Sequence, residues 1–205
     1  MTSERAGAWA LISGSLAGVA LMALHPIHAS AMPSLGPWSL NSLVHATAIV
    51  ATPVLFFGTL ALSRFLGADR PLVQLALCLY GFASVAIIGA ATMSGLVMQE
   101  IVEAAHTPGA SHTGLDFQSL ANETHWINQG FAQVFTGLAS LAVLLWSIAW
   151  RGWGVRILGL VLSLAVLGWQ LSGTMELNVH GMGAVVLTQT VWMITAAVMM
   201  LRAKS

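Results

Sequence analysis

The stretch Asn178-Val179-His180-Gly181-Met182-Gly183 begins the last long apolar segment of the chain. Two earlier segments begin in the same way, one at Asn41-Ser42-Leu43-Val44-His45 and the other at Asn122-Glu123-Thr124-His125-Trp126. The three segments end at arginines, which are Arg202, Arg64 and Arg151 in turn. Each is long enough to cross a membrane as a helix. The pattern therefore predicts membrane helices that run in the same direction, each with a histidine near its start.

The composition supports a membrane location for the whole chain. Of its 205 residues, 57% are hydrophobic and only 7% are charged, and the mean hydropathy is +0.83. Soluble domains carry roughly 25% charged residues, so these few charges cannot cover a surface that faces water. The formal net charge is zero, which argues against a nucleic-acid partner. We therefore expect an all-α integral membrane protein whose main surroundings are the lipid bilayer.

Apolar segments long enough to span a bilayer recur throughout the chain. They predict a six-transmembrane-helix bundle, built as three helical hairpins in a single domain over residues 1–205. The expected spans are 8–25, 43–63, 72–98, 126–150, 154–172 and 181–201.

The ionisable residues divide between the two sides of the membrane. All seven lysines and arginines lie near the chain termini or in the second and fourth connections between spans. Because cytoplasmic loops are rich in these residues, both termini are expected in the cytoplasm. All seven histidines fall on the opposite, non-cytoplasmic side. We expect the membrane to be a bacterial inner membrane. Trp146, Trp150 and Trp153 are expected at its cytoplasmic interface.

The first span also has features of a signal peptide. Arg5 precedes the apolar run, and Ala29-Ser30-Ala31 has the small residues of a cleavage site. The apolar run is longer than the usual signal-peptide core of 7–15 residues. We therefore expect a retained helix, with cleavage as the alternative.

The histidines near the starts of parallel helices form the candidate site. His45, His125 and His180 are expected at a similar depth near the outer interface, and His25 ends an outward helix at that level. Histidine nitrogens bind zinc, copper and iron. The sequence therefore predicts a divalent transition-metal site. A simpler interpretation is that these histidines only anchor the helix ends at the interface.

Carboxylates and amides close to these histidines extend the candidate site. Glu176 and Glu123 are candidates for further ligands or for acceptors that orient an imidazole. Beyond Met98 the third span becomes amphipathic, and Glu100, Glu103 and His106 repeat at helical spacing. A solvated helix extension explains that last group equally simply. The amides expected to line a cavity below the histidines are Asn128, Gln129 and Gln133.

These residues leave several functions open. The first is a metal-dependent enzyme that acts on a lipid or a quinone-like molecule, because a bound metal polarises carbonyls and activates water. The second is an electron-transfer protein with haem b held by two histidines, although no lysine or arginine is available on that side for the propionates. A small transporter and a structural subunit of a membrane complex, both without metal, are the remaining alternatives.

Overall fold

The computed structural model describes residues 3–25, 34–35, 38–106 and 116–203. Its helices are α1 (Ser3–Leu24), α2 (Leu40–Leu66), α3 (Pro71–Thr92), α4 (Met98–His106), α5 (Phe117–Ala149), α6 (Trp153–Leu171) and α7 (Val179–Arg202). A π-helical turn, η2 (Met93–Val97), joins α3 to α4 without a break. A small antiparallel ribbon pairs β1 (Ser34–Leu35) with β2 (Trp38–Ser39).

The helices confirm the expected membrane class. Within the described ranges, six helical stretches are long and apolar enough to cross a membrane, with the third running from Pro71 to His106. Each of these stretches contains one of the spans expected from the sequence or nearly all of it. The Ala29-Ser30-Ala31 motif lies outside the described residues, so cleavage of the first span is not tested.

The helices pack in the order of the chain. Consecutive membrane helices contact one another from α1 through α2, α3, α5 and α6 to α7, and α7 returns to pack against α1. The result is a ring in which each membrane helix has a neighbour on both sides. The grouping into three separate hairpins stays a prediction.

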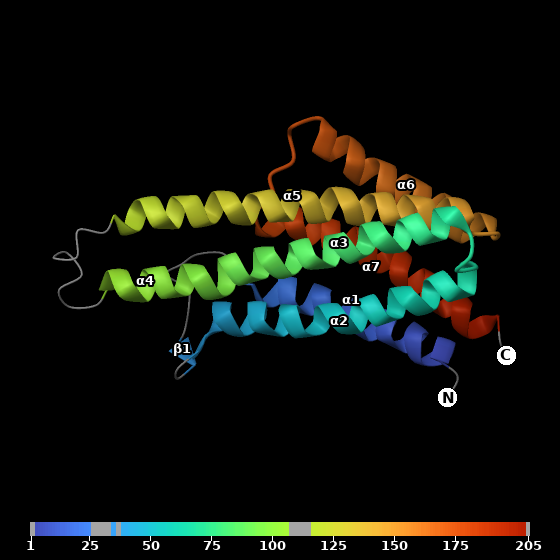
Figure 1. The fold of residues 1–205 in the computed structure, drawn as a ribbon, viewed down its shortest axis with the longest axis horizontal. Coiled ribbons are helices and arrows are strands. Elements are labelled where there is room, and N and C mark those ends of the chain that lie inside the picture. The colour runs from blue at the N-terminus through green and yellow to red at the C-terminus, as the bar shows by residue number, and fades with distance from the viewer. Residues whose placement is uncertain (1–2, 26–33, 36–37, 107–115, 204–205) are drawn as a thin grey trace.

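The two ends of the bundle differ in chemistry. Helix α1 begins and helix α7 ends at one end, which also carries the α2–α3 and α5–α6 connections (Figure 1). We call this the basic end, because the arginines of these segments lie there: Arg5, Arg64, Arg70, Arg151, Arg156 and Arg202. The other end, where α1 finishes and where α2, α5 and α7 start, is called the histidine end.

An aromatic cluster fills the bundle near its basic end. Trp146 of α5 and Trp192 of α7 are fully buried and stack with ring centroids 6.2 Å apart. The indole N–H of Trp146 donates to the hydroxyl of Ser63 at 3.2 Å, and that of Trp192 donates to the carbonyl of Val155 at 3.2 Å. Both polar indole groups are thus satisfied inside the bundle.

This cluster corrects the expectation that Trp146 and Trp150 mark the membrane interface. Both are buried, and Trp150 packs edge-on against Trp192. Only Trp153 of the expected group is exposed, at 75%. The prediction was wrong because a tryptophan near the end of a span can face its neighbouring helices as readily as the lipid. Sequence position does not distinguish the two.

Helix α5 begins earlier than expected. Its first residue is Phe117, and the carboxylate of Asp116 caps the helix by accepting hydrogen bonds from the amides of Gln118 and Ser119. Hydrogen bonds from the hydroxyl and the amide of Ser119 hold the pKa of Asp116 below its usual range. A charged cap at a helix start is favourable. Polar turns therefore precede the apolar span that hydropathy detects.

A pair of glycine variants on α6 tests the packing at the basic end. In G159L the new side chain would collide with the hydroxyl of Ser147 and the ring of Trp192, whereas at Gly168 a Cβ meets no atom within 4 Å. Overpacking a filled core costs about 1–3 kcal/mol, so we expect G159L to have the lower thermal midpoint and G168L to resemble the wild type. Tryptophan fluorescence of the detergent-purified variants measures both midpoints. Equal midpoints would contradict this packing.

Candidate functional site

A cavity of about 340 Å³ opens inside the ring, in the half nearer the histidine end. Side chains from α1, α2, α3, η2, α5 and α7 line it, and α6 does not. Its polar wall includes His25, His45, Ser94, His125, Asn128 and Gln129. Of the described residues that line it, none is a lysine, arginine, aspartate or glutamate. The cavity thus combines an apolar wall with a few neutral or imidazole groups, as small-molecule sites commonly do.

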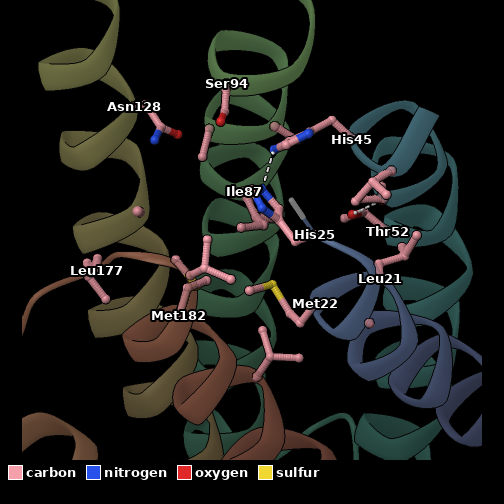
Figure 2. A pocket seen from close by; sticks show the side chains of 18 of the residues that line it. Leu21, Met22, His25, His45, Thr52, Ile87, Ser94, Asn128, Leu177 and Met182 are labelled. Carbon is pink, nitrogen blue, oxygen red and sulfur yellow. Dashed lines mark hydrogen bonds between the residues drawn. The ribbon is translucent and has the colours of Figure 1, made fainter. Parts of the chain in front are cut away.

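Two histidines meet at the edge of this cavity. The Nε2 atoms of His25, at the end of α1, and His45, in the second turn of α2, lie 3.3 Å apart. The two rings meet edge to face, with centroids 4.8 Å apart (Figure 2). His45 is buried and His25 is half-buried. The pair therefore presents two imidazole nitrogens to each other where the bundle is shielded from water.

The orientation of the His45 ring is fixed by the backbone of its own helix. Nδ1 of His45 lies 2.8 Å from the carbonyl oxygen of Asn41. A carbonyl can only accept, so Nδ1 carries the hydrogen and donates it. In the neutral ring, Nε2 then has a lone pair that accepts a hydrogen bond from Nε2–H of His25.

The π-helical turn η2 is the platform against which α2 packs. The Asn41 side-chain amide donates to the carbonyl of Ser94 at 3.0 Å, and the Ser42 hydroxyl donates to the carbonyl of Gly95 at 3.0 Å. A Cβ at Gly95 would overlap the Cβ of His45, so only glycine allows this close approach. These contacts hold the first turns of α2, and with them His45, against η2. Turns of this kind occur often at functional sites.

The histidines expected as a trio are placed differently from one another. His125 lines the same cavity as His25 and His45, in the third turn of α5, and is largely exposed beside Trp126. His180 is exposed in the first turn of α7 and does not line the cavity. Among the described residues, no three histidine, cysteine or carboxylate side chains are placed to share a metal ion. A site formed by His45, His125 and His180 together stays a prediction.

The expected carboxylates lie on the surface, and none of them lines the cavity. Glu123 is exposed on α5, and Glu176 accepts a hydrogen bond from the side-chain amide of Asn178. Glu100, Glu103 and His106 are exposed on α4, which is the solvated extension considered above. Glu103 accepts a hydrogen bond from Gln99 at 2.7 Å, and Nδ1 of His106 donates to the carbonyl of Val102.

The three α5 side-chain amides that were expected to line the cavity do not all do so. Asn128 and Gln129 line the cavity, and Gln129 donates to the carbonyl of Leu177 at 3.3 Å. Gln133 is exposed, and its backbone carbonyl accepts a hydrogen bond from Gln170. Asn41, Ser42 and Gly95 were not predicted as positioning residues. For Asn41 and Ser42 the available signal was polar residues at the start of an apolar span, which helix capping also explains.

The contact between α2 and η2 can be tested with one pair of variants. N41A removes the donor to the Ser94 carbonyl, and a hydrogen bond of this kind contributes about 0.5–1.5 kcal/mol to stability. T47A is the control, because the hydroxyl of Thr47 bonds only within α2, to the carbonyl of Leu43. We expect faster hydrogen–deuterium exchange over residues 93–106 and a lower thermal midpoint in N41A than in T47A. Equal hydrogen–deuterium exchange in the two variants would show that the Asn41–Ser94 hydrogen bond does not hold α2 against η2.

Comparison with known proteins adds no further assignment. No family model, no curated protein and no solved structure matches this chain. What the molecule does is therefore inferred from its own geometry, and above all from the His25–His45 pair at the edge of the cavity.

Proposed function

We propose that this multi-pass membrane protein binds a divalent transition metal (zinc, copper or iron) at the histidine end of its bundle, with His25 and His45 as ligands. The observation that carries the proposal is the 3.3 Å separation of their Nε2 atoms. Two nitrogens that each lie about 2.0–2.1 Å from a tetrahedral metal are roughly 3.3–3.4 Å apart. The pair therefore has the spacing that two ligands of one ion require.

The environment of His45 supports the same role. A histidine that binds a metal through one nitrogen usually donates its other N–H to a carbonyl or carboxylate, which fixes the ring. His45 does this through Nδ1 and the Asn41 carbonyl. His125 lines the same cavity, but it does not form with His25 and His45 a group of three side chains placed to share an ion. A tetrahedral ion held by two histidines keeps positions open to water or to a substrate.

A metal with an open position would supply Lewis acidity to a bound carbonyl or water. The adjoining cavity would give a lipid-soluble substrate access to it. We therefore favour a metal-dependent enzyme over the haem b alternative, because the described lining residues include no lysine or arginine to pair with haem propionates. An intense absorption band near 400 nm in the purified protein would reverse this preference.

Metal content distinguishes the His25–His45 pair from the trio of His45, His125 and His180 that the sequence predicted. After loading with zinc and removal of excess ion, we expect elemental analysis to find about one equivalent in the wild type. H25A and H45A should bind at least about tenfold more weakly, because each loses a direct ligand. H180A should retain the metal, because His180 is exposed away from the cavity.

The controls separate loss of metal from loss of structure. Each variant is compared with the wild type by size-exclusion profile and thermal midpoint before loading. Full metal content in folded H25A and H45A would overturn the proposed pair. Loss of metal in both H45A and H180A, with full metal content in H25A, would favour the trio of His45, His125 and His180 that the sequence predicted.

We also propose that the basic end faces the cytoplasm and the histidine end faces outward, in a bacterial inner membrane. The support is the segregation of charge: every lysine and arginine of the sequence belongs to the termini or to the α2–α3 and α5–α6 connections. Cytoplasmic loops are enriched in these residues because they determine the direction of insertion. A metal taken from outside the cell would then reach the histidines without crossing the membrane.

Two single-cysteine variants test this orientation. Asp69 follows α2 at the basic end and Asp116 caps α5 at the histidine end, and both are exposed. In a C78S background, which removes the native cysteine, we expect a membrane-impermeant maleimide to label D116C in intact spheroplasts. D69C should react only after the membrane is permeabilised. The reverse pattern would invert the proposed topology.

A further inference from the structure

The lining of the cavity restricts the charge of any ligand inside it. Among the described residues that line it, none carries a permanent charge, and the titratable groups are His25, His45 and His125. Burying an unpaired ion in such a place is costly. A phosphate-bearing or ammonium-bearing headgroup would find no oppositely charged partner there. The ligand that fits this wall is therefore neutral.

Hydrogen-bonding groups stand on opposite sides of the cavity. Asn128 of α5 lies on one side, His25 and His45 lie on the other, and Ser94 of η2 lies between them (Figure 2). The Asn128 amide and the Ser94 hydroxyl make no hydrogen bond within the described part of the chain, although both line the cavity. Both can donate, so a ligand with two carbonyl acceptors would engage the Asn128 amide and the Ser94 hydroxyl.

The deeper wall is apolar and adaptable. Leu21, Leu55, Ile87 and Val186 line it. Met22 from α1 and Met182 from α7 extend toward one another across it (Figure 2). Methionine side chains adjust their shape to flat or irregular apolar groups. The volume of about 340 Å³ lies at the small end of ligand sites, which suits one ring better than a headgroup with two acyl chains.

We propose that this cavity binds a neutral, lipid-soluble quinone, with one ring carbonyl near the Asn128 amide and the other near the Ser94 hydroxyl. The ring rests between the apolar walls, and its aliphatic tail continues toward the lipid. This inference goes beyond the proposed metal site and does not require it, because Asn128 and the apolar wall act without an ion.

Binding of decylubiquinone to the purified full-length protein tests the proposal. Calorimetry is run on zinc-loaded protein and on protein stripped with a chelator, with decylbenzene as a ligand of similar shape that lacks carbonyls. We expect both protein forms to bind the quinone and to bind decylbenzene at least tenfold more weakly. If metal binding fails but the stripped protein still binds quinone, the cavity proposal stands and the metal proposal falls.

Two matched pairs of variants locate the bound ring. N128L removes a donor at the cavity wall, and Q133L makes the same change at an exposed position of the same helix. Loss of one hydrogen bond should weaken quinone binding about three- to tenfold in N128L only. A51W fills the cavity, whereas V50W places its ring at a position that is 71% exposed. A51W should abolish binding, and V50W should preserve it.

Several results would overturn the proposal. Equal affinity for decylubiquinone and decylbenzene would show that the cavity accepts any apolar molecule. Undiminished binding in A51W, if the thermal midpoint shows that this variant is folded, would place the quinone elsewhere. Equal loss in N128L and Q133L would remove the proposed contact with the Asn128 amide.

Discussion

The site depends on how the backbone of η2 is satisfied inside a membrane helix. No water in the hydrocarbon region is available to hydrogen-bond with carbonyls, so an irregular turn there needs partners from neighbouring helices. Asn41 and Ser42 supply those partners to Ser94 and Gly95. Because these donors stand just before His45 on α2, the contact that satisfies the turn also places the imidazole. The contact between α2 and η2 therefore both satisfies the backbone of the turn and positions the candidate ligand His45.

The size of the side chains explains why the cavity lies at the histidine end. Near the basic end, the large rings of Trp146 and Trp192 occupy the centre of the bundle. Arg70 also joins two helix ends there, by donating to the carbonyls of Leu66 and Ala149. In the other half, small residues face inward: Gly14, Gly18, Ala48, Ala51, Ala90, Ala91 and Ala132. The bundle is therefore closed at one end and hollow at the other.

Hydropathy predicted the membrane helices well, because a span must be apolar along its whole length whatever it packs against. It failed at the start of α5, where a polar helix capped by Asp116 precedes the apolar span. It also could not assign Trp146 and Trp150 to the core. Hydropathy reports depth in the membrane, whereas burial depends on the direction in which a side chain points around its helix. The π-helical turn leaves no periodic signal, so neither η2 nor its partners could be predicted.

The same distinction explains why the structure pairs His45 with His25. Parallel helices can place His45, His125 and His180 at a similar depth, but each ring faces the direction set by its own helix. His25 ends α1 and His45 begins α2, and these two helices pack against each other. The two imidazoles therefore lie at the same depth in the membrane, and both side chains point toward the same space. A site built on this pair is asymmetric: the imidazoles lie on the α1–α2 side, and the Asn128 amide faces them from α5 (Figure 2).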